Sequence, residues 1–266
     1  MEFEESRLYQ LGDDVRSIDW RVTARSGNLH TKLFHEELER PVLLLVDGSP
    51  SMRFGTRIRL KSVQACRYAA LAAWSALRRG DRIGAIFTSP AGLQEVRPGG
   101  RHPHLLSLLR RLSEWHNALL HEGEAVGWVE ERYPAAYPLH EALRTARRLA
   151  PPGSLIYIIS DWIRLDTELL QLLGALKRHH DLRAVQVLDE LDERLPDSGT
   201  YPVQGRDPDS GEAPLVWLDC GLPELRAQHE LRFREHQQHL QSSLRSHGVP
   251  LISLRTQEDV HDLPLY

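Results

Sequence analysis

The chain has 266 residues, 41% of them hydrophobic, so it can bury a full core, and we expect one large α/β domain rather than two small ones. Its formal net charge of -4 excludes a general attraction for nucleic acid or anionic lipid. Cys66 and Cys220 lie far apart in sequence, which excludes a disulfide framework and a paired-cysteine metal site. No apolar run reaches the roughly 18 residues that cross a bilayer, and the first residues do not resemble a secretory signal, so we expect a soluble, cytoplasmic protein.

Residues 1–40 are charged and irregular, with acidic residues set among arginines. Their sparse apolar side chains are typical of anchors, so we expect this segment to pack on the domain formed by residues 41–266. The acids between the arginines argue against a nucleic-acid site and favour salt bridges or contact with a protein partner. The residues that we expect to bind a partner are Trp20, Arg16 and Arg21.

Continuous apolar runs and helical spacing predict the first elements of the domain. The run at 42–47 is too short for a helix and shows no polar alternation, which is typical of a parallel strand covered on both faces. Apolar residues at three- and four-residue spacing predict an amphipathic helix at 61–79 that ends at Gly80. These apolar residues are Val63, Cys66, Ala70, Ala73, Trp74 and Leu77. The elements expected next are strands at 82–88 and 93–97, helices at 104–116 and 138–149, and a loop at 121–137.

The second half of the chain repeats this alternation. The run at 155–160 is another continuous apolar strand and, like the first, it ends at an aspartate, Asp161. Strands that alternate with helices predict an α/β fold with a mostly parallel central sheet flanked by helices. The remaining predicted elements are a helix at 167–180, a strand at 182–188, an elaboration at 189–223 with a hairpin near 208–211, a long polar helix at 224–246 and a strand at 250–254.

Oxygen ligands gather where the first of these strands ends. Asp47, Ser49 and Ser51 stand at alternate positions of a tight turn, and an acid with two hydroxyls is the hard-oxygen set that suits Mg²⁺ or Mn²⁺. Ligands of open α/β sheets bind outside the carboxyl ends of the strands, so Asp161 would face this turn if the two strands are neighbours. The alternative is that Gly, Ser, Pro and Asp only build the turn in which a strand must end.

Other chemistries have weaker support in the sequence. Ser49 and Ser51 do not stand in the G-x-S-x-G pattern of a serine nucleophile, and Asp47 lacks the second acid of a D-x-D phosphotransferase. No glycine-rich phosphate loop is present, so nucleotide binding is not predicted. Histidines on the long polar helix share part of one face, but we expect them to be solvated rather than metal ligands. They are His229, His236 and His239.

Several motifs resemble those of a known family. The D-x-S-x-S turn, the strand GDRIGAIF and a later apolar strand ending in Asp are similar to a von Willebrand factor A domain. More specifically, the chain resembles the bacterial family called domain of unknown function 58 in the segments EFEESRLYQLGDDVRSIDWRVTARSGNL, HEELERPVLLLVDGSPSMRFG, IISDW and VLDELDERLP. The resemblance implies a von Willebrand factor A-like fold with a metal-ion-dependent adhesion site, in which a partner's carboxylate completes the ion's shell. The residues that would hold the ion are Asp47, Ser49, Ser51 and Asp161.

One position departs from the pattern that this resemblance implies. Such sites commonly offer a threonine before a helix, and Tyr137 stands in its place in this chain. A phenol is bulkier than a threonine hydroxyl and, with an ordinary pKa of about 10, is a poor anionic ligand at neutral pH. Tyr137 is therefore a doubtful metal position, and weak ion binding or a vestigial site is the alternative.

The resemblance also implies a function. Relatives are commonly encoded beside MoxR-type AAA ATPases, which implies a non-enzymatic adaptor or co-chaperone that acts with such an ATPase on a client complex. The predicted mechanism is capture of a partner's carboxylate through Mg²⁺ or Mn²⁺. One alternative is a metal-dependent hydrolase in the same crevice, for which the sequence nominates no general base. Another is a binding module with a vestigial metal site that acts through residues 1–40.

Overall fold

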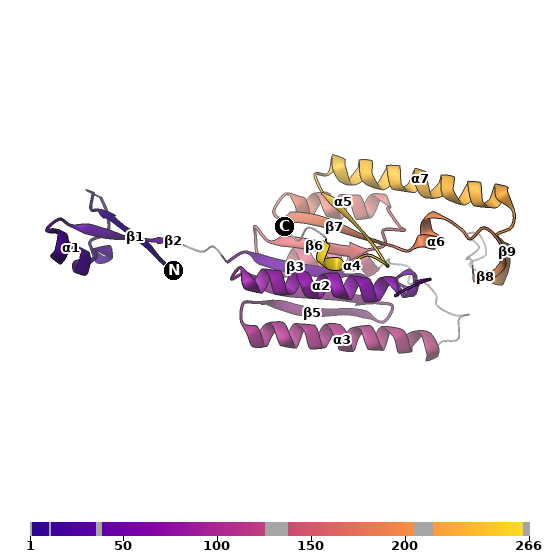
Figure 1. Ribbon diagram of the computed structural model, residues 1–266, viewed down its shortest axis with the longest axis horizontal. Coiled ribbons are helices and arrows are strands. Elements are labelled where there is room, and N and C mark those ends of the chain that lie inside the picture. The colour runs from indigo at the N-terminus through magenta and orange to yellow at the C-terminus, as the bar shows by residue number, and fades with distance from the viewer. Residues whose placement is uncertain (1, 11, 36–38, 126–137, 205–214, 263–266) are drawn as a thin grey trace. The chain divides into compact units, whose positions relative to one another are not determined.

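The computed structural model describes residues 2–10, 12–35, 39–125, 138–204 and 215–262 (Figure 1). The chain divides into two compact units, Met1–Glu39 and Arg40–Tyr266. Each unit has its own sheet, and the predicted site residues at the strand ends belong to the larger one.

The smaller unit is a two-stranded antiparallel sheet, in which β1 (Glu2–Leu8) pairs with β2 (His30–His35). Between these strands, α1 (Trp20–Ser26) is capped by the Asp19 carboxylate and ends at Gly27, whose φ of 73° is a left-handed conformation that glycine adopts without strain. The expectation of an irregular segment was wrong in this respect, because strands so rich in charge lack the apolar alternation that predicts a strand. Packing of this segment on the larger unit stays a prediction.

The larger unit is built on a six-stranded sheet with the strand order β10-β7-β6-β3-β4-β5 (Figure 1). Neighbouring strands are parallel except β4 and β5, so the predicted mostly parallel sheet is confirmed. From β3 the chain continues to β4 on one side and returns later as β6 on the other, which makes the carboxyl end of β3 a topological switch point. The strands are β3 (Pro41–Val46), β4 (Arg82–Ser89), β5 (Gly92–Gly99), β6 (Leu155–Ser160), β7 (Asp181–Leu188) and β10 (Leu251–Arg255).

Helices cover both faces of this sheet (Figure 1). On β3, Val42, Leu44 and Val46 join the core formed with α2 and α3, whereas Leu43 and Leu45 join the core formed with α4, α5 and α7. Because both sets are buried, the strand is apolar at every position, as a parallel strand covered on both faces should be. The helices are α2 (Lys61–Arg78), α3 (His102–Ala125), α4 (Pro138–Leu149), α5 (Thr167–Lys177) and α7 (Pro223–Ser246).

The predicted elements of the larger unit are present with shifted ends. α3 continues past residue 116 to Ala125, because the buried stripe that contains Leu112 and Trp115 extends to Leu119. The first residues of the predicted loop at 121–137 are therefore helical, and residues 126–137 lie outside the described residues.

The elaboration after β7 consists of short elements. It contains α6 (Glu190–Glu193) and the antiparallel strands β8 (Thr200–Gln204) and β9 (Leu215–Asp219), which confirms the predicted hairpin. The turn of the hairpin lies outside the described residues. Across the described ranges, no helix combines the length and the apolar character that crossing a membrane requires.

The buried stripe of α2 differs from the predicted one. Of the six residues that sequence spacing placed on the apolar face, Ala73 is fully buried and Trp74 is exposed, and the side chains that face the sheet lie mainly on an adjacent stripe. The small alanines of that stripe let the helix lie close to the strands. Its members are Lys61, Ala65, Tyr68, Ala69, Ala72, Ala73 and Ala76. A buried lysine therefore begins the stripe, at the end of α2 that follows the Ser49–Ser51 turn.

Trp115 connects α3 to the end of β4 next to the predicted site. Its ring stacks on Phe87 with centroids 5.4 Å apart, and its Nε1 donates to the Thr88 carbonyl at 3.0 Å. Trp115→Phe removes this donor from a buried carbonyl, so we expect urea denaturation to show a loss of about 1–3 kcal/mol in the free energy of unfolding. Trp74→Phe, at a 40% exposed position of α2, is the control and should change it by less than about 0.5 kcal/mol. Equal losses in both variants would contradict this role of Trp115.

Candidate functional site

The predicted strand-end aspartates meet at the carboxyl end of the sheet. Strands β3 and β6 are neighbours, with Val46 opposite Ile159, so Asp47 and Asp161 follow adjacent strands at the switch point. The backbone N–H of Asp47 donates to the Ile159 carbonyl at 2.9 Å and so extends the pairing beyond β3. Both carboxylates are buried. The fold therefore brings two carboxyl groups together away from water.

The Asp47 carboxylate is held by donors from several segments. Its Oδ1 accepts hydrogen bonds from the Ser49 N–H at 3.0 Å and from Thr88 Oγ1 at 3.2 Å. Its Oδ2 accepts from Ser49 Oγ at 3.1 Å and from Ser160 Oγ at 2.6 Å. Hydrogen bonds of this kind stabilise the ionised form of a carboxyl group. They explain how the end of β3 tolerates a buried aspartate.

Gly48 allows the same turn to approach β4 so closely that a side chain would not fit. Its N–H donates to Thr88 Oγ1 at 2.9 Å, so the turn lies directly against β4. A Cβ at this position would lie 2.1 Å from the Thr88 carbonyl oxygen and 2.6 Å from Cζ2 of Trp115. Glycine alone fits this approach without displacing the strand.

Hydroxyl groups link the two carboxylates. Ser49 Oγ lies 3.1 Å from Ser51 Oγ, and the Ser51 side chain hydrogen-bonds to Asp161. Burial raises the pKa of Asp161, and the Asp47 charge raises it further, although Lys61 and Ser51 act in the opposite direction. Ser51 is half-buried and is the most exposed of the predicted ligands, so access from solvent is through Ser51. The sequence motif has thus become one hydrogen-bonded cluster.

Lys61 brings a buried positive charge to this cluster. Its side chain is 1% exposed, and Nζ lies 3.5 Å from Asp161 Oδ2 and 2.8 Å from Asp192 Oδ2 of α6. The ammonium also lies 5.7 Å from the centroid of the Phe54 ring. It compensates part of the carboxylate charge at this end of the sheet.

A third strand also ends at an aspartate. Asp189 follows β7 and accepts hydrogen bonds from the Thr56 hydroxyl at 2.5 Å and from the Thr256 hydroxyl at 2.9 Å. Thr56 lies in the connection from the Ser49–Ser51 turn to α2, and Thr256 follows β10. Asp189 therefore ties the site loop to two neighbouring strands.

Two histidines of α7 fix the loops beside the site. Trp162, which follows β6, has a φ of 57° that non-glycine residues rarely adopt, and its side chain is fully buried. Its carbonyl accepts from His236 Nε2 at 2.9 Å, and the Leu191 carbonyl of α6 accepts from His229 Nε2 at 3.0 Å. The expectation that these histidines are merely solvated was wrong, because His236 and His229 each donate to a backbone carbonyl beside the site. The third histidine of the set is exposed.

The donor set fits a hard divalent cation. Carboxylate and hydroxyl oxygens lie together, and burial raises the pKa of Asp161, which disfavours its ionised form, whereas a bound cation would stabilise that form. Within the part of the chain that the structure describes, no group of three or more His, Cys, Asp or Glu side chains is placed to hold a metal, so an ion here would depend on serine hydroxyls. Tyr137 lies outside the described residues. The residues that could hold an ion are Asp47, Ser49, Ser51 and Asp161.

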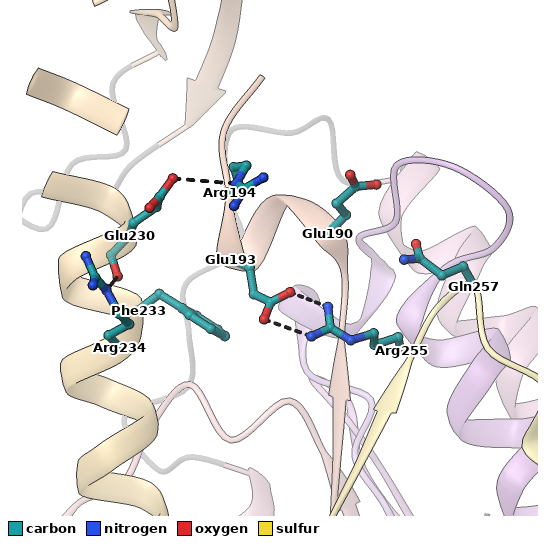
Figure 2. Close-up of a pocket in the computed structure, with 8 residues that line it drawn as sticks. All are labelled: Glu190, Glu193, Arg194, Glu230, Phe233, Arg234, Arg255 and Gln257. Atoms are coloured by element: carbon teal, nitrogen blue, oxygen red, sulfur yellow. Dashed lines mark hydrogen bonds and ion pairs between the residues drawn. The ribbon is translucent and has the colours of Figure 1, made fainter. Parts of the chain in front are cut away.

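A pocket of about 370 Å³ lies between α6, α7 and the end of β10 (Figure 2). Arg255 donates to both carboxylate oxygens of Glu193, and Arg194 Nε lies 3.6 Å from Glu230 Oε1. Figure 2 shows Phe233 of α7 among these charged side chains. Because the acids and arginines of its walls pair with one another, the pocket is better explained as a groove between elements than as a ligand site.

The partner-binding residues predicted in the smaller unit are exposed. Trp20 begins α1, and Arg16 and Arg21 lie close to it in the chain. An exposed tryptophan among arginines has the composition of a protein interface. Binding of a partner at these residues stays a prediction.

Sequence reasoning missed several polar residues of the site. Thr88 and Ser160 stand at or near the ends of apolar strands and Asp189 follows another, so the strand-end rule that identified the first aspartates could have found them. Lys61 is a charged residue at the first position of the buried stripe of α2, which is a weaker signal. Asp192 carries no signal of its own, since its contact with Lys61 depends on how α6 returns to the sheet.

The fold and the cluster define an α/β domain with an oxygen-lined site at the switch point of its sheet. The family model described as "Protein of unknown function DUF58" matches residues 5–239, and the chain belongs to this family. Two uncharacterized mycobacterial proteins are similar to it, Rv1480 of Mycobacterium tuberculosis and Mb1516 of Mycobacterium bovis. Each is 32% identical over 259 residues, which cover 96% of this chain and 74% of the relative.

Solved structures with a similar fold include an aerotolerance-related membrane protein from Bacteroides fragilis (TM-score 0.48, 14% identity, 84% of this chain and 94% of that chain). The SpRpn10 VWA domain is similar with a TM-score of 0.40 and 11% identity, over 85% of this chain and 93% of that chain. A von Willebrand factor type A structure from Catenulispora acidiphila has a TM-score of 0.39 and 13% identity, over 60% of this chain and 35% of that chain. These are likenesses of fold.

The Glu193–Arg255 pair should make stability depend on pH. The hydrogen bonds from Arg255 lower the pKa of Glu193 below its ordinary value of 4.5, so the pair contributes stability at neutral pH and loses it as pH falls through the lowered pKa. Glu193→Gln should reduce the free energy of unfolding at pH 7 by up to about 1 kcal/mol, and this difference should shrink in acid. Chemical denaturation between pH 3 and 7 measures it, with exposed Glu235→Gln on α7 as the control. A difference that persists unchanged at pH 3 would contradict the assignment.

Proposed function

We propose that the protein is a non-enzymatic binding module, an adaptor or co-chaperone that receives a partner's carboxylate through a divalent ion, Mg²⁺ or Mn²⁺. The observation that carries the proposal is the cluster of two buried carboxylates joined by serine hydroxyls. When bound, the ion supplies a positive centre for an acidic side chain of the partner. The residues that would hold it are Asp47, Ser49, Ser51 and Asp161.

The surroundings of the hydroxyls support binding more than catalysis. Ser49 donates to the Asp47 carboxylate and is buried, whereas a serine nucleophile needs a base and access to substrate. Ser62 does hydrogen-bond to a histidine, His116, at 3.0 Å, but Ser62 is fully buried on α2. Within the cluster the serine side chains are therefore better suited to coordinate than to attack.

Apolar side chains near the cluster support a protein as the partner. Phe54 and Ile58, in the connection to α2, are exposed, and so is Ile163, in the loop after β6. The backbone N–H of Ile163 donates to Asp161 Oδ1 at 3.4 Å, and the Phe54 ring lies beside Lys61, so both adjoin the cluster. Large apolar side chains around a charged centre match the composition of protein interfaces.

The class of partner is proposed from the family resemblance. We expect a MoxR-type AAA ATPase and a client complex in the cytoplasm, with Trp20, Arg16 and Arg21 as a second contact. The vestigial-site alternative places the binding energy in the smaller unit instead. In that case Trp20→Ala would abolish partner binding while Ser51→Ala would leave it intact.

Loss of one hydroxyl should weaken ion binding. Isothermal titration of Mg²⁺ or Mn²⁺ into chelator-stripped protein should give saturable binding, and Ser51→Ala should bind at least about tenfold more weakly because it lacks one oxygen ligand. Ser242→Ala, at an exposed position of α7, is the matched control and should bind like the wild type. Equal affinity of Ser51→Ala and the wild type would contradict the ion site.

The hydrolase alternative has its own test. With Mn²⁺ present, we expect the wild type to hydrolyse p-nitrophenyl phosphate and p-nitrophenyl acetate no faster than Asp161→Asn, because no base has been identified for a bound water. Absorbance of released nitrophenol measures both reactions. Turnover that the wild type shows and Asp161→Asn loses would favour the hydrolase.

A further inference from the structure

Lys61 stands where neither its position at the helix N-terminus nor its burial favours a positive charge. It is the first residue of α2, and a helix N-terminus carries a partial positive charge that repels cations. The N-cap residue, Leu60, makes no side-chain hydrogen bond to the first turn, and Lys61 is buried. Burial of an ammonium group is unfavourable unless carboxylates compensate it. The position of Lys61 therefore depends on the acids around it.

The fold aims this lysine at the site and anchors it there. Lys61 begins the stripe of α2 that faces the sheet, so Nζ reaches the end of β6, 3.5 Å from Asp161 Oδ2. It is closer to Asp192, at 2.8 Å and 2.9 Å from the two carboxylate oxygens. Asp192 is itself fixed, because it accepts from the Asp189 N–H at 2.7 Å within the capping box of α6.

Lys61 and a divalent ion require the same carboxylate. Asp161 belongs to the ion cluster, whereas Asp192 holds the ammonium from outside it. An ion bound at Asp161 would lie close to the ammonium, and like charges at a buried site repel strongly because solvent screens them little. An ion can therefore bind only if the ammonium moves away from Asp161, or if the binding free energy of the ion exceeds the repulsion between the two cations.

We propose that Lys61 is a built-in competitor of the divalent ion: its ammonium, anchored by Asp192, neutralises Asp161 and sets the affinity of the site for Mg²⁺ and Mn²⁺. The inference rests on the proposed function and deepens it, since it names the residue that regulates the same site. A partner's carboxylate adds negative charge and so favours the ion over the lysine. The protein alone then binds the ion weakly, and partner and ion strengthen each other's binding.

The test is the affinity of chelator-stripped protein for Mn²⁺, measured by isothermal titration. The double variant Lys61→Met with Asp192→Asn removes the buried pair without changing net charge, and Lys61→Gln removes the ammonium but keeps a donor for Asp192. We expect Mn²⁺ to bind at least about tenfold more tightly to either variant than to the wild type, equivalent to about 1.4 kcal/mol. The matched control is Lys177→Met with Asp181→Asn, an exposed ion pair of 3.3 Å at the amino end of β7, which should leave the affinity unchanged.

The outcomes distinguish failure of the Lys61 proposal from failure of the ion site. Tighter binding by the variants that Ser51→Ala then abolishes supports Lys61 as the competitor and locates the ion in the cluster. Saturable binding by the wild type with equal or weaker binding by both variants overturns the role of Lys61 and leaves the ion site intact. If neither the wild type nor a variant binds Mn²⁺, the ion site fails and the inference fails with it. Thermal unfolding in chelator establishes that each variant is folded.

Discussion

Two carboxylates that are buried side by side set the conditions for the rest of this structure. The pairing of β3 with β6 places Asp47 and Asp161 at the switch point of the sheet, where neither is solvated. Buried charges persist in a fold only when donors or cations compensate them. The side chains that do so are Ser49, Thr88 and Ser160 at Asp47, and Ser51 and Lys61 at Asp161.

The surrounding loops are shaped by this requirement. Gly48 lets the turn approach β4. Asp189 hydrogen-bonds to Thr56 and so joins the connection that leads to α2 to the ends of β7 and β10. From the other face of the sheet, His236 holds the left-handed Trp162 in place. A cluster supported in this way is preorganised, so the proposed ion would meet oxygens that are already in position. The exposed apolar residues near the cluster would then pack against the proposed partner.

The place of the site was predictable because strand ends follow simple rules. Continuous apolar runs identify buried parallel strands, and the ends of such strands meet at one edge, so Asp47 and Asp161 could be placed at the same edge before the fold was known. That they lie side by side depended on their strands being neighbours, which the sequence left open. The lysine could not be placed in this way. Apolar residues occupy more than one stripe of α2, so spacing alone pointed to Val63 and Cys66, and only packing against the sheet selects the stripe of Lys61. Strands β1 and β2 were not predicted, because their sequences lack the apolar alternation that identifies a strand.

Crystallography with Mn²⁺ would test the central claim most directly, because anomalous scattering locates the ion among the side chains. We expect an anomalous peak coordinated by the hydroxyls of Ser49 and Ser51, with the Lys61 ammonium withdrawn from Asp161 and held by Asp192. If the side chains of the cluster are resolved in the electron density at saturating Mn²⁺, but no anomalous peak lies among them and Lys61 still contacts Asp161, the result would contradict an ion-dependent binding site in this protein.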